Sequence, residues 1–179
     1  MADHSTSRLW LMRALFIGIA LATILVHLLP LGSTPRRWAG PDLIMALAFA
    51  WSLRRPEYVP ALSIGVIFLL ADLLYQNPPG LLAALVVIGS ESLKSRARAL
   101  REQPFVVEWF NASVVIFAIT VIYRMILAIL LIPQASFSLS LTQAAATALL
   151  YPMVVFVSQS VFGIQKSALG DVNALGQRL

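Results

Sequence analysis

The chain has 179 residues, of which 59% are hydrophobic and only 12% are charged, and its mean hydropathy is +0.84. Soluble domains carry about 25% charged residues, so this chain cannot cover itself with a polar shell and lipid must be its solvent. The net charge of +5 does not indicate a nucleic-acid-binding protein, because the basic residues lie between apolar runs rather than along a groove or stripe. The absence of cysteine excludes disulfides, thiolate metal sites and cysteine nucleophiles.

Six apolar runs divide the chain and predict an all-α integral membrane protein, a bundle of six transmembrane helices. The runs cover residues 9–29, 41–53, 58–75, 80–93, 105–132 and 141–164. Crossing the hydrocarbon takes about 20 residues, and the second and fourth runs are shorter. They either cross, by tilting inside the bundle, thinning the bilayer locally or borrowing flanking polar residues, or re-enter on the same side. Residues 1–164 are expected to form one transmembrane domain, and residues 165–179 a short polar cytoplasmic tail.

The first run follows Arg8 and Arg13, so it has the outline of a signal peptide as well as that of an anchor. Its apolar stretch is long for the core of a signal peptide, and no clear Ala-x-Ala cleavage site follows it. We therefore interpret it as a retained first span.

The second run opens with Pro41 and Asp42 and closes at a basic corner formed by Arg54, Arg55 and Pro56. A proline in the first turn and an acid near the positive end of a helix form a good N-terminal signal, which accounts for the opening residues structurally. The corner can anchor the topology on the cytoplasmic side or dock a cytoplasmic partner, and the sequence leaves both interpretations open.

Asp72 stands in an otherwise apolar run, just before the turn-forming sequence Asn-Pro-Pro-Gly at 77–80. It is either a polar residue near the outer interface, hydrated or capping a neighbouring helix, or a buried partner of Arg124, the basic residue inside the fifth run. Both lie about six residues outward from the middle of their spans, or roughly 9 Å. An unpaired charge there costs about 2.5–3.5 kcal/mol, so an Asp72–Arg124 ion pair is a candidate. Without that pair, Arg124 is expected to meet a lipid phosphate or an acid of another subunit.

The segment between the fourth and fifth runs, residues 91–103, is the most charged part of the chain. It carries an inner-leaflet basic cluster made of Lys94, Arg96, Arg98 and Arg101. At about 1 kcal/mol per basic residue near an anionic surface, the cluster is expected to hold this loop against the membrane.

The distribution of lysine and arginine predicts that both termini are cytoplasmic. In that frame the inner segments hold ten of the 13 basic residues, and the outer segments hold only Arg36 and Arg37. The inner ten are Arg8, Arg13, Arg54, Arg55, Lys94, Arg96, Arg98, Arg101, Lys166 and Arg178. Re-entry of the second or fourth run would reverse the later loops, so the same asymmetry argues that both runs cross. The tryptophans also fall near predicted interfaces, as in an aromatic belt: Trp10, Trp38, Trp51 and Trp109.

No constellation of catalytic or metal-binding residues is visible. His4 and His27 are far apart and have no partner at ligand spacing. No histidine lies in the last three runs to serve a membrane serine protease, and neither Asp42 nor Asp72 has the Gly-x-Gly-Asp setting of an intramembrane aspartyl protease. Phosphate-loop and dinucleotide motifs are missing as well. We expect no enzymatic activity, no metal, no cofactor and no nucleic-acid partner.

The order of several short motifs resembles the MreD family, the membrane subunit of the bacterial rod-shape machinery. The motifs are Pro-Asp-Leu at 41–43, Arg-Arg-Pro at 54–56, Asp-Leu-Leu at 72–74 before Pro-Gly at 79–80, and Tyr-Pro at 151–152. The resemblance covers nearly the whole chain, and the order of the motifs is more specific than any one of them. Their candidate structural or partner-docking residues are Pro41, Asp42, Arg54, Arg55, Pro56, Pro79, Gly80 and Pro152.

The resemblance implies a non-enzymatic scaffold in the bacterial inner membrane. Members of this family work with MreC, the filament protein MreB, and RodA with its penicillin-binding protein in cell-wall elongation. The fold is expected to be similar to the substrate-binding subunits of energy-coupling-factor transporters, so a vitamin-type binding subunit is the alternative function. Against that alternative, the outer loops are short and carry no polar cluster that would recognise a vitamin.

Overall fold

The computed structural model describes residues 2–29 and 40–164, and side chains from residue 6 onward. The described residues form six α-helices and one 3-10 helix, with no strand among them. The helices are α1 (Ala2–Leu28), α2 (Leu43–Arg54), η1 (Pro56–Tyr58), α3 (Ala61–Leu74), α4 (Leu81–Ala97), α5 (Phe105–Ile129) and α6 (Phe137–Phe162). The predicted all-helical class is confirmed.

Three of these helices are long and apolar enough to cross a membrane, over Thr6–Leu28, Phe105–Ile129 and Phe137–Phe162. The transmembrane character predicted from composition is therefore supported. Helices α2 and α3 are also apolar but have 12 and 14 residues, which correspond to about 18 and 21 Å of rise. The crossing of all six helices stays a prediction.

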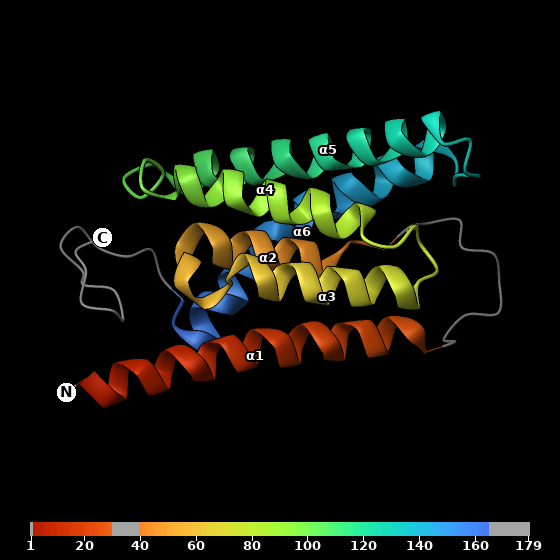
Figure 1. Cartoon of the computed structure of the whole chain (residues 1–179). Coiled ribbons are helices and arrows are strands. Elements are labelled where there is room, and N and C mark those ends of the chain that lie inside the picture. The colour runs from red at the N-terminus through yellow and green to blue at the C-terminus, as the bar shows by residue number, and fades with distance from the viewer. Residues whose placement is uncertain (1, 30–39, 165–179) are drawn as a thin grey trace.

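The short helix α2 lies at the centre of the bundle, between α4 and α6 (Figure 1). Every residue from Ile44 to Arg54 is buried. A helix that is buried on all sides needs no polar face, which explains its mostly apolar composition. Helix α1 lies along one side of the bundle and contacts η1 and α3, and α5 lies on the other side. Helix α6 packs against α5 and α2 and crosses behind α2 (Figure 1).

Trp51 shows how far this burial changes an expectation from sequence. Its side chain has no exposed surface, lies 5.6 Å from the ring of Phe16 between centroids, and donates from Nε1 to Ser158 Oγ at 3.1 Å. The prediction that Trp51 belongs to an interfacial aromatic belt is wrong. Because α2 is central and short, even its last turn lies inside the protein.

The helix bounds depart from the apolar runs where backbone hydrogen bonding and hydropathy disagree. Helix α4 continues to Ala97 through polar residues, whereas its apolar run ends at residue 93. Helix α5 ends at Ile129, because Leu131 takes a left-handed conformation with φ of 54°. There Ile132 N donates to Leu127 O at 3.0 Å and Leu131 N to Ala128 O at 3.2 Å, which is a Schellman ending.

Close packing of α4 against its neighbours depends on Gly89. A Cβ placed there would lie 2.8 Å from Ile119 Cδ1 and 2.9 Å from Val115 Cγ1, both on α5. Small residues let helix backbones approach in membrane bundles, and Gly89 has this role between α4 and α5.

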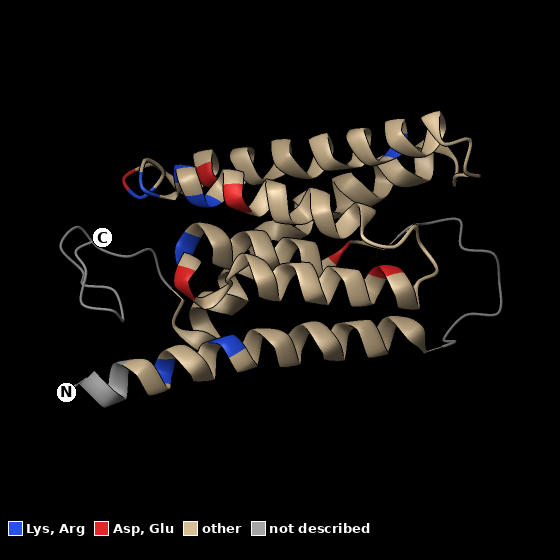
Figure 2. Cartoon of the chain, in the orientation of Figure 1, with Lys and Arg blue, Asp and Glu red and all other residues tan. Residues whose placement is uncertain are grey.

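Charged residues divide between the two ends of the bundle (Figure 2). Lysine and arginine gather at the end where α1 begins and α2 and α4 finish, which we call the basic end. The other end, which we call the opposite end, holds Asp42, Asp72 and Arg124. The successive helices α1 to α6 alternate in direction, so the grouping of the described basic residues matches the predicted charge asymmetry (Figure 1), while Arg36, Arg37, Lys166 and Arg178 lie outside the described residues. Which end faces the cytoplasm stays a prediction.

Candidate functional site

A buried ion pair joins α2 to α5 at the basic end. Arg54 Nε lies 3.0 Å from Glu108 Oε1, and the two side chains are 7% and 1% exposed. Arg54 is the last residue of α2, and Glu108 lies in the first turn of α5. An acid in the first turn of a helix is favoured by the helix dipole, so Glu108 suits both its helix and its partner.

Two residues of α6 complete this network, which we call the Arg54–Glu108 network. Tyr151 Oη donates to Glu108 Oε1 at 3.2 Å, and Arg54 Nη1 donates to Gln159 Oε1 at 3.4 Å. The network ties α2, α5 and α6 together at one level. Arg54 therefore has a structural role between helices, and docking of a partner at this corner stays a prediction.

The corner after α2 is held by a second group of contacts. Pro56 occupies the first position of η1, where a missing N–H costs nothing. Arg55 Nη1 lies 3.6 Å from Glu57 Oε1, and Arg13 Nε of α1 donates to Glu57 O at 3.1 Å. Lys94 Nζ of α4 donates to Val59 O at 2.6 Å.

Within the predicted inner-leaflet basic cluster, the four residues have different surroundings. Lys94 is tied to the chain through Val59 and through Glu91 Oε1 at 2.8 Å. Arg96 and Arg98 are exposed, and Arg101 is half-buried in the turn before α5. The exposed pair is therefore best placed to meet a membrane surface or a partner.

Asp72 is fully buried near the end of α3 and caps the next helix. Its Oδ2 accepts from Gly80 N at 3.1 Å and from Ala83 N at 3.3 Å, two of the donors at the start of α4 that have no partner within the helix. Pro79 and Gly80 form the turn that directs those donors toward Asp72. Leu81 N donates to Pro78 O, and Gly80 has a φ of 82°. These are the features of a type II turn, which places glycine at the left-handed position.

Arg124 has different partners from those of Asp72. Its Nη1 donates to Ala135 O at 2.9 Å and to Ser140 Oγ at 2.7 Å, and its guanidinium lies 5.4 Å from the centroid of the Phe137 ring. No ion pair joins Asp72 and Arg124 in residues 40–164, so the structure contradicts the predicted pair. Matched depth was not sufficient, because Asp72 Oδ2 is engaged by the start of α4, while Asp72 Oδ1 is buried and has no hydrogen-bond partner among the described residues.

Asp42 confirms the acid predicted at the start of α2, whereas Pro41 precedes the N-cap and does not lie in the first turn as predicted. Its Oδ1 accepts from Met45 N at 2.9 Å, the bond expected of an N-cap, and its own N–H donates to Thr147 Oγ1 of α6 at 2.8 Å. Asp42 therefore begins α2 and also fastens it to α6.

Pro152 has a structural role inside α6. Proline has no N–H, so the carbonyl of Ala148, four residues earlier, loses its usual helical partner. Trp109 Nε1 of α5 donates to Ala148 O at 2.7 Å. The proline thus releases an acceptor that joins α5 to α6.

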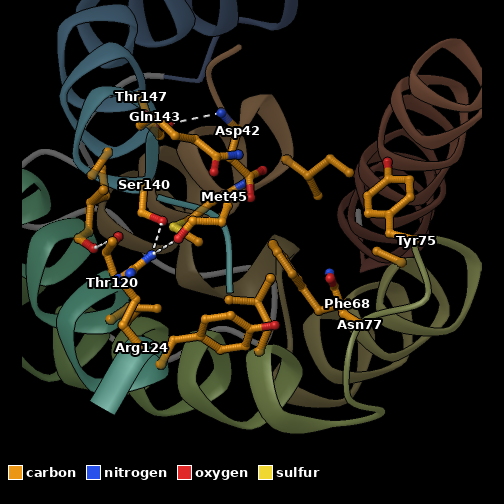
Figure 3. Close-up of a pocket in the computed structure, with 18 of the residues that line it drawn as sticks. Asp42, Met45, Phe68, Tyr75, Asn77, Thr120, Arg124, Ser140, Gln143 and Thr147 are labelled. Atoms are coloured by element: carbon orange, nitrogen blue, oxygen red, sulfur yellow. Dashed lines mark hydrogen bonds between the residues drawn. The ribbon is translucent and has the colours of Figure 1, made fainter. Parts of the chain in front are cut away.

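A cavity of about 560 Å³ lies at the opposite end, and residues of all six helices line it (Figure 3). Its volume falls within the range of small-molecule sites. Pro41 lies in its wall, beside apolar side chains such as Phe68 and Ile119. Polar side chains of the wall include His27, Asp42, Thr120, Arg124, Gln143 and Thr147.

The cavity overturns one argument made from the sequence. The short outer loops carry no obvious polar cluster, but helix residues that are distant in the chain assemble one. Sequence reasoning also missed Glu108, although an acid one turn into a long apolar run was a signal for a buried partner. Among the described residues, no three His, Asp or Glu side chains are placed to share a metal ion.

Comparisons of the chain with protein-family models, with curated proteins and with solved structures found no match.

Proposed function

We propose that this protein is a non-enzymatic scaffold of the bacterial cell-wall elongation machinery, similar to MreD. It would lie in the inner membrane and organise peptidoglycan synthesis together with MreC, MreB and RodA with its penicillin-binding protein. The proposal rests on the order of the motifs along the chain, and one structural observation adds to it.

That observation concerns the contacts that the motif residues make in the structure. Asp42 caps α2, Arg54 pairs with Glu108, and Asp72 caps α4 at Gly80. Each motif therefore defines a joint between helices of one particular bundle. Motifs that specify a bundle are what a scaffold needs, since its function is to present surfaces to partner proteins.

The outward faces of α5 and α6 are suitable for such partners. They expose large apolar side chains, including Phe110, Ile122 and Met125 on α5 and Met153 and Phe156 on α6. In a bilayer these faces meet lipid or the membrane helix of another protein.

The direct test is purification of the intact protein from the membranes of its own host in mild detergent, followed by identification of what accompanies it. We expect MreC in stoichiometric amount. A matched preparation with Glu108→Gln, which weakens the joint between α2 and α5, should recover less MreC. Recovery of other elongation proteins without MreC would contradict the proposed arrangement.

The cavity favours a second candidate, a small-molecule-binding subunit of a transporter. Its volume of about 560 Å³ and its mixed polar and apolar wall suit a small ligand. In that case the same purification would recover an ATP-hydrolysing module in place of MreC.

A further inference from the structure

Arg124 is a cation inside a predicted span, and within the described part of the chain no carboxylate forms an ion pair with it. Its Nη1 is used by Ala135 O and Ser140 Oγ, which are both neutral acceptors. Its Nε and Nη2 donors make no hydrogen bond with residues 40–164, although a guanidinium has five N–H donors in a rigid fork. Charged residues within membrane spans are costly and usually mark a binding site or pathway.

Arg124 is one of the residues that line the cavity (Figure 3). Apolar side chains make up much of the remaining wall, among them Phe68, Ile119 and Leu127. A site with one guanidinium and apolar walls suits a ligand that carries an anionic group on an apolar body.

The other ionisable groups of the cavity do not neutralise Arg124 from within the protein. The acid of the wall is Asp42, which is engaged at the start of α2 through Met45 N. Asp42 contacts Thr147 and Arg124 contacts Ser140, and these two residues of α6 are seven positions apart, or about 10 Å along the helix. The cavity is also lined by His27, Tyr75 and Tyr123, none of which is a carboxylic acid.

The expected depth of Arg124 in the membrane indicates which anion lies near it. Helix α5 has 25 residues and is about 37 Å long, whereas the hydrocarbon core is about 30 Å thick. Arg124 lies five residues before the end of α5, so with α5 centred on the hydrocarbon core it falls within a few ångströms of the boundary. Lipid phosphates begin at this level, and arginine binds phosphate through two parallel hydrogen bonds.

We propose that the cavity binds an organic phosphate, with the phosphate oxygens on Arg124 and an apolar body against the walls formed by Phe68, Ile119 and Leu127. The phosphate comes from a membrane phospholipid or from a soluble metabolite. This binding site does not depend on the proposed scaffold function. A failure to bind phosphate would therefore not decide whether MreC is recovered with the protein.

The test uses the full chain in a neutral detergent, with binding followed by native mass spectrometry. Three probes separate the possibilities: dioctanoyl phosphatidylglycerol, glycerol 3-phosphate and dioctanoylglycerol. We expect saturable binding of a phosphate-bearing probe at one site and none of dioctanoylglycerol. Binding of the phospholipid alone identifies a lipid as the source, and binding of glycerol 3-phosphate identifies a soluble phosphate.

Substitutions then assign the site. Arg124→Gln should weaken binding about tenfold or more, because charged hydrogen bonds are lost. Arg98→Gln removes the same charge from an exposed position at the basic end and should change binding less than twofold. Arg124→Lys keeps the charge without the fork and should be intermediate, which preserves the test if Arg124→Gln does not fold.

Three results would overturn the proposal. The first is that neither phosphate probe binds saturably. The second is that dioctanoylglycerol binds as tightly as the phospholipid. The third is that Arg124→Gln and Arg98→Gln weaken binding equally, which would indicate general attraction of anionic lipid to a basic protein.

Discussion

At the scale of single residues, buried charged side chains connect one helix of this protein to another. Asp72 lies in an apolar run because the start of α4 needs an acceptor, and a carboxylate eight residues earlier supplies it. A carboxylate also interacts favourably with the positive end of that helix. The acid is therefore a cap, and Arg124 is left to other partners.

The separation of Asp72 from Arg124 makes a quantitative prediction. Asp72→Asn and Arg124→Gln should lower the free energy of unfolding independently, and the double variant should equal their sum within about 0.5 kcal/mol. The measurement is equilibrium unfolding in mixed micelles of dodecyl maltoside and sodium dodecyl sulfate. A coupling energy above roughly 1 kcal/mol would mean that the two residues do meet.

The Arg54–Glu108 network should be far more sensitive. Glu108→Gln leaves Arg54 buried without its partner and is expected to cost roughly 3–5 kcal/mol of unfolding free energy. Glu91→Gln is the matched control, since Glu91 is 50% exposed and its pair with Lys94 should be worth less than about 1 kcal/mol. Equal losses in the two variants, measured in the same micelles, would refute the role of the network.

At the scale of helices, local signals in the sequence were more informative than signals between distant segments. The cap by Asp42 lies three residues from its donor and follows a proline, so it was predictable. The cap by Asp72 on Gly80 spans eight residues and was one of the two interpretations left open. Arg54 and Glu108 are 54 residues apart, and only the packing of α2 against α5 brings them together.

The same distinction explains the errors about position. A hydropathy pattern does not distinguish a residue that contacts lipid from one that is buried in the protein core. Trp51 was therefore expected at an interface, whereas its side chain is buried. The cavity draws on all six helices, and no single segment carries a sign of it.

Packing between helices gives a prediction at Gly89. Gly89→Ala should lower the melting temperature in detergent, because the new methyl group meets Ile119 and Val115 at under 3 Å. Gly18→Ala on α1 is the control: nothing lies within 4 Å of its Cβ position, so the gain in helix propensity should leave stability unchanged or raised. A Gly89→Ala protein as stable as the Gly18→Ala protein would show that α4 and α5 pack less closely than described.

At the scale of the whole molecule, the division of charge between the two ends predicts sidedness. Ser7→Cys and Glu102→Cys at the basic end should be protected from a membrane-impermeant thiol reagent in intact cells, and Ser136→Cys at the opposite end should be labelled. The natural chain has no cysteine, so each labelling signal is unambiguous. Labelling of the residues at positions 7 and 102 but not of that at 136 would invert the topology.

The central claim is that this membrane bundle organises wall synthesis without catalysing it. Its most direct test is controlled depletion in the host, with new sidewall peptidoglycan followed by fluorescent D-amino acids. We predict that lateral insertion declines, that cells become round, and that re-expression of the wild-type chain restores both. Depleted cells that keep their rod shape and normal sidewall labelling would contradict the account.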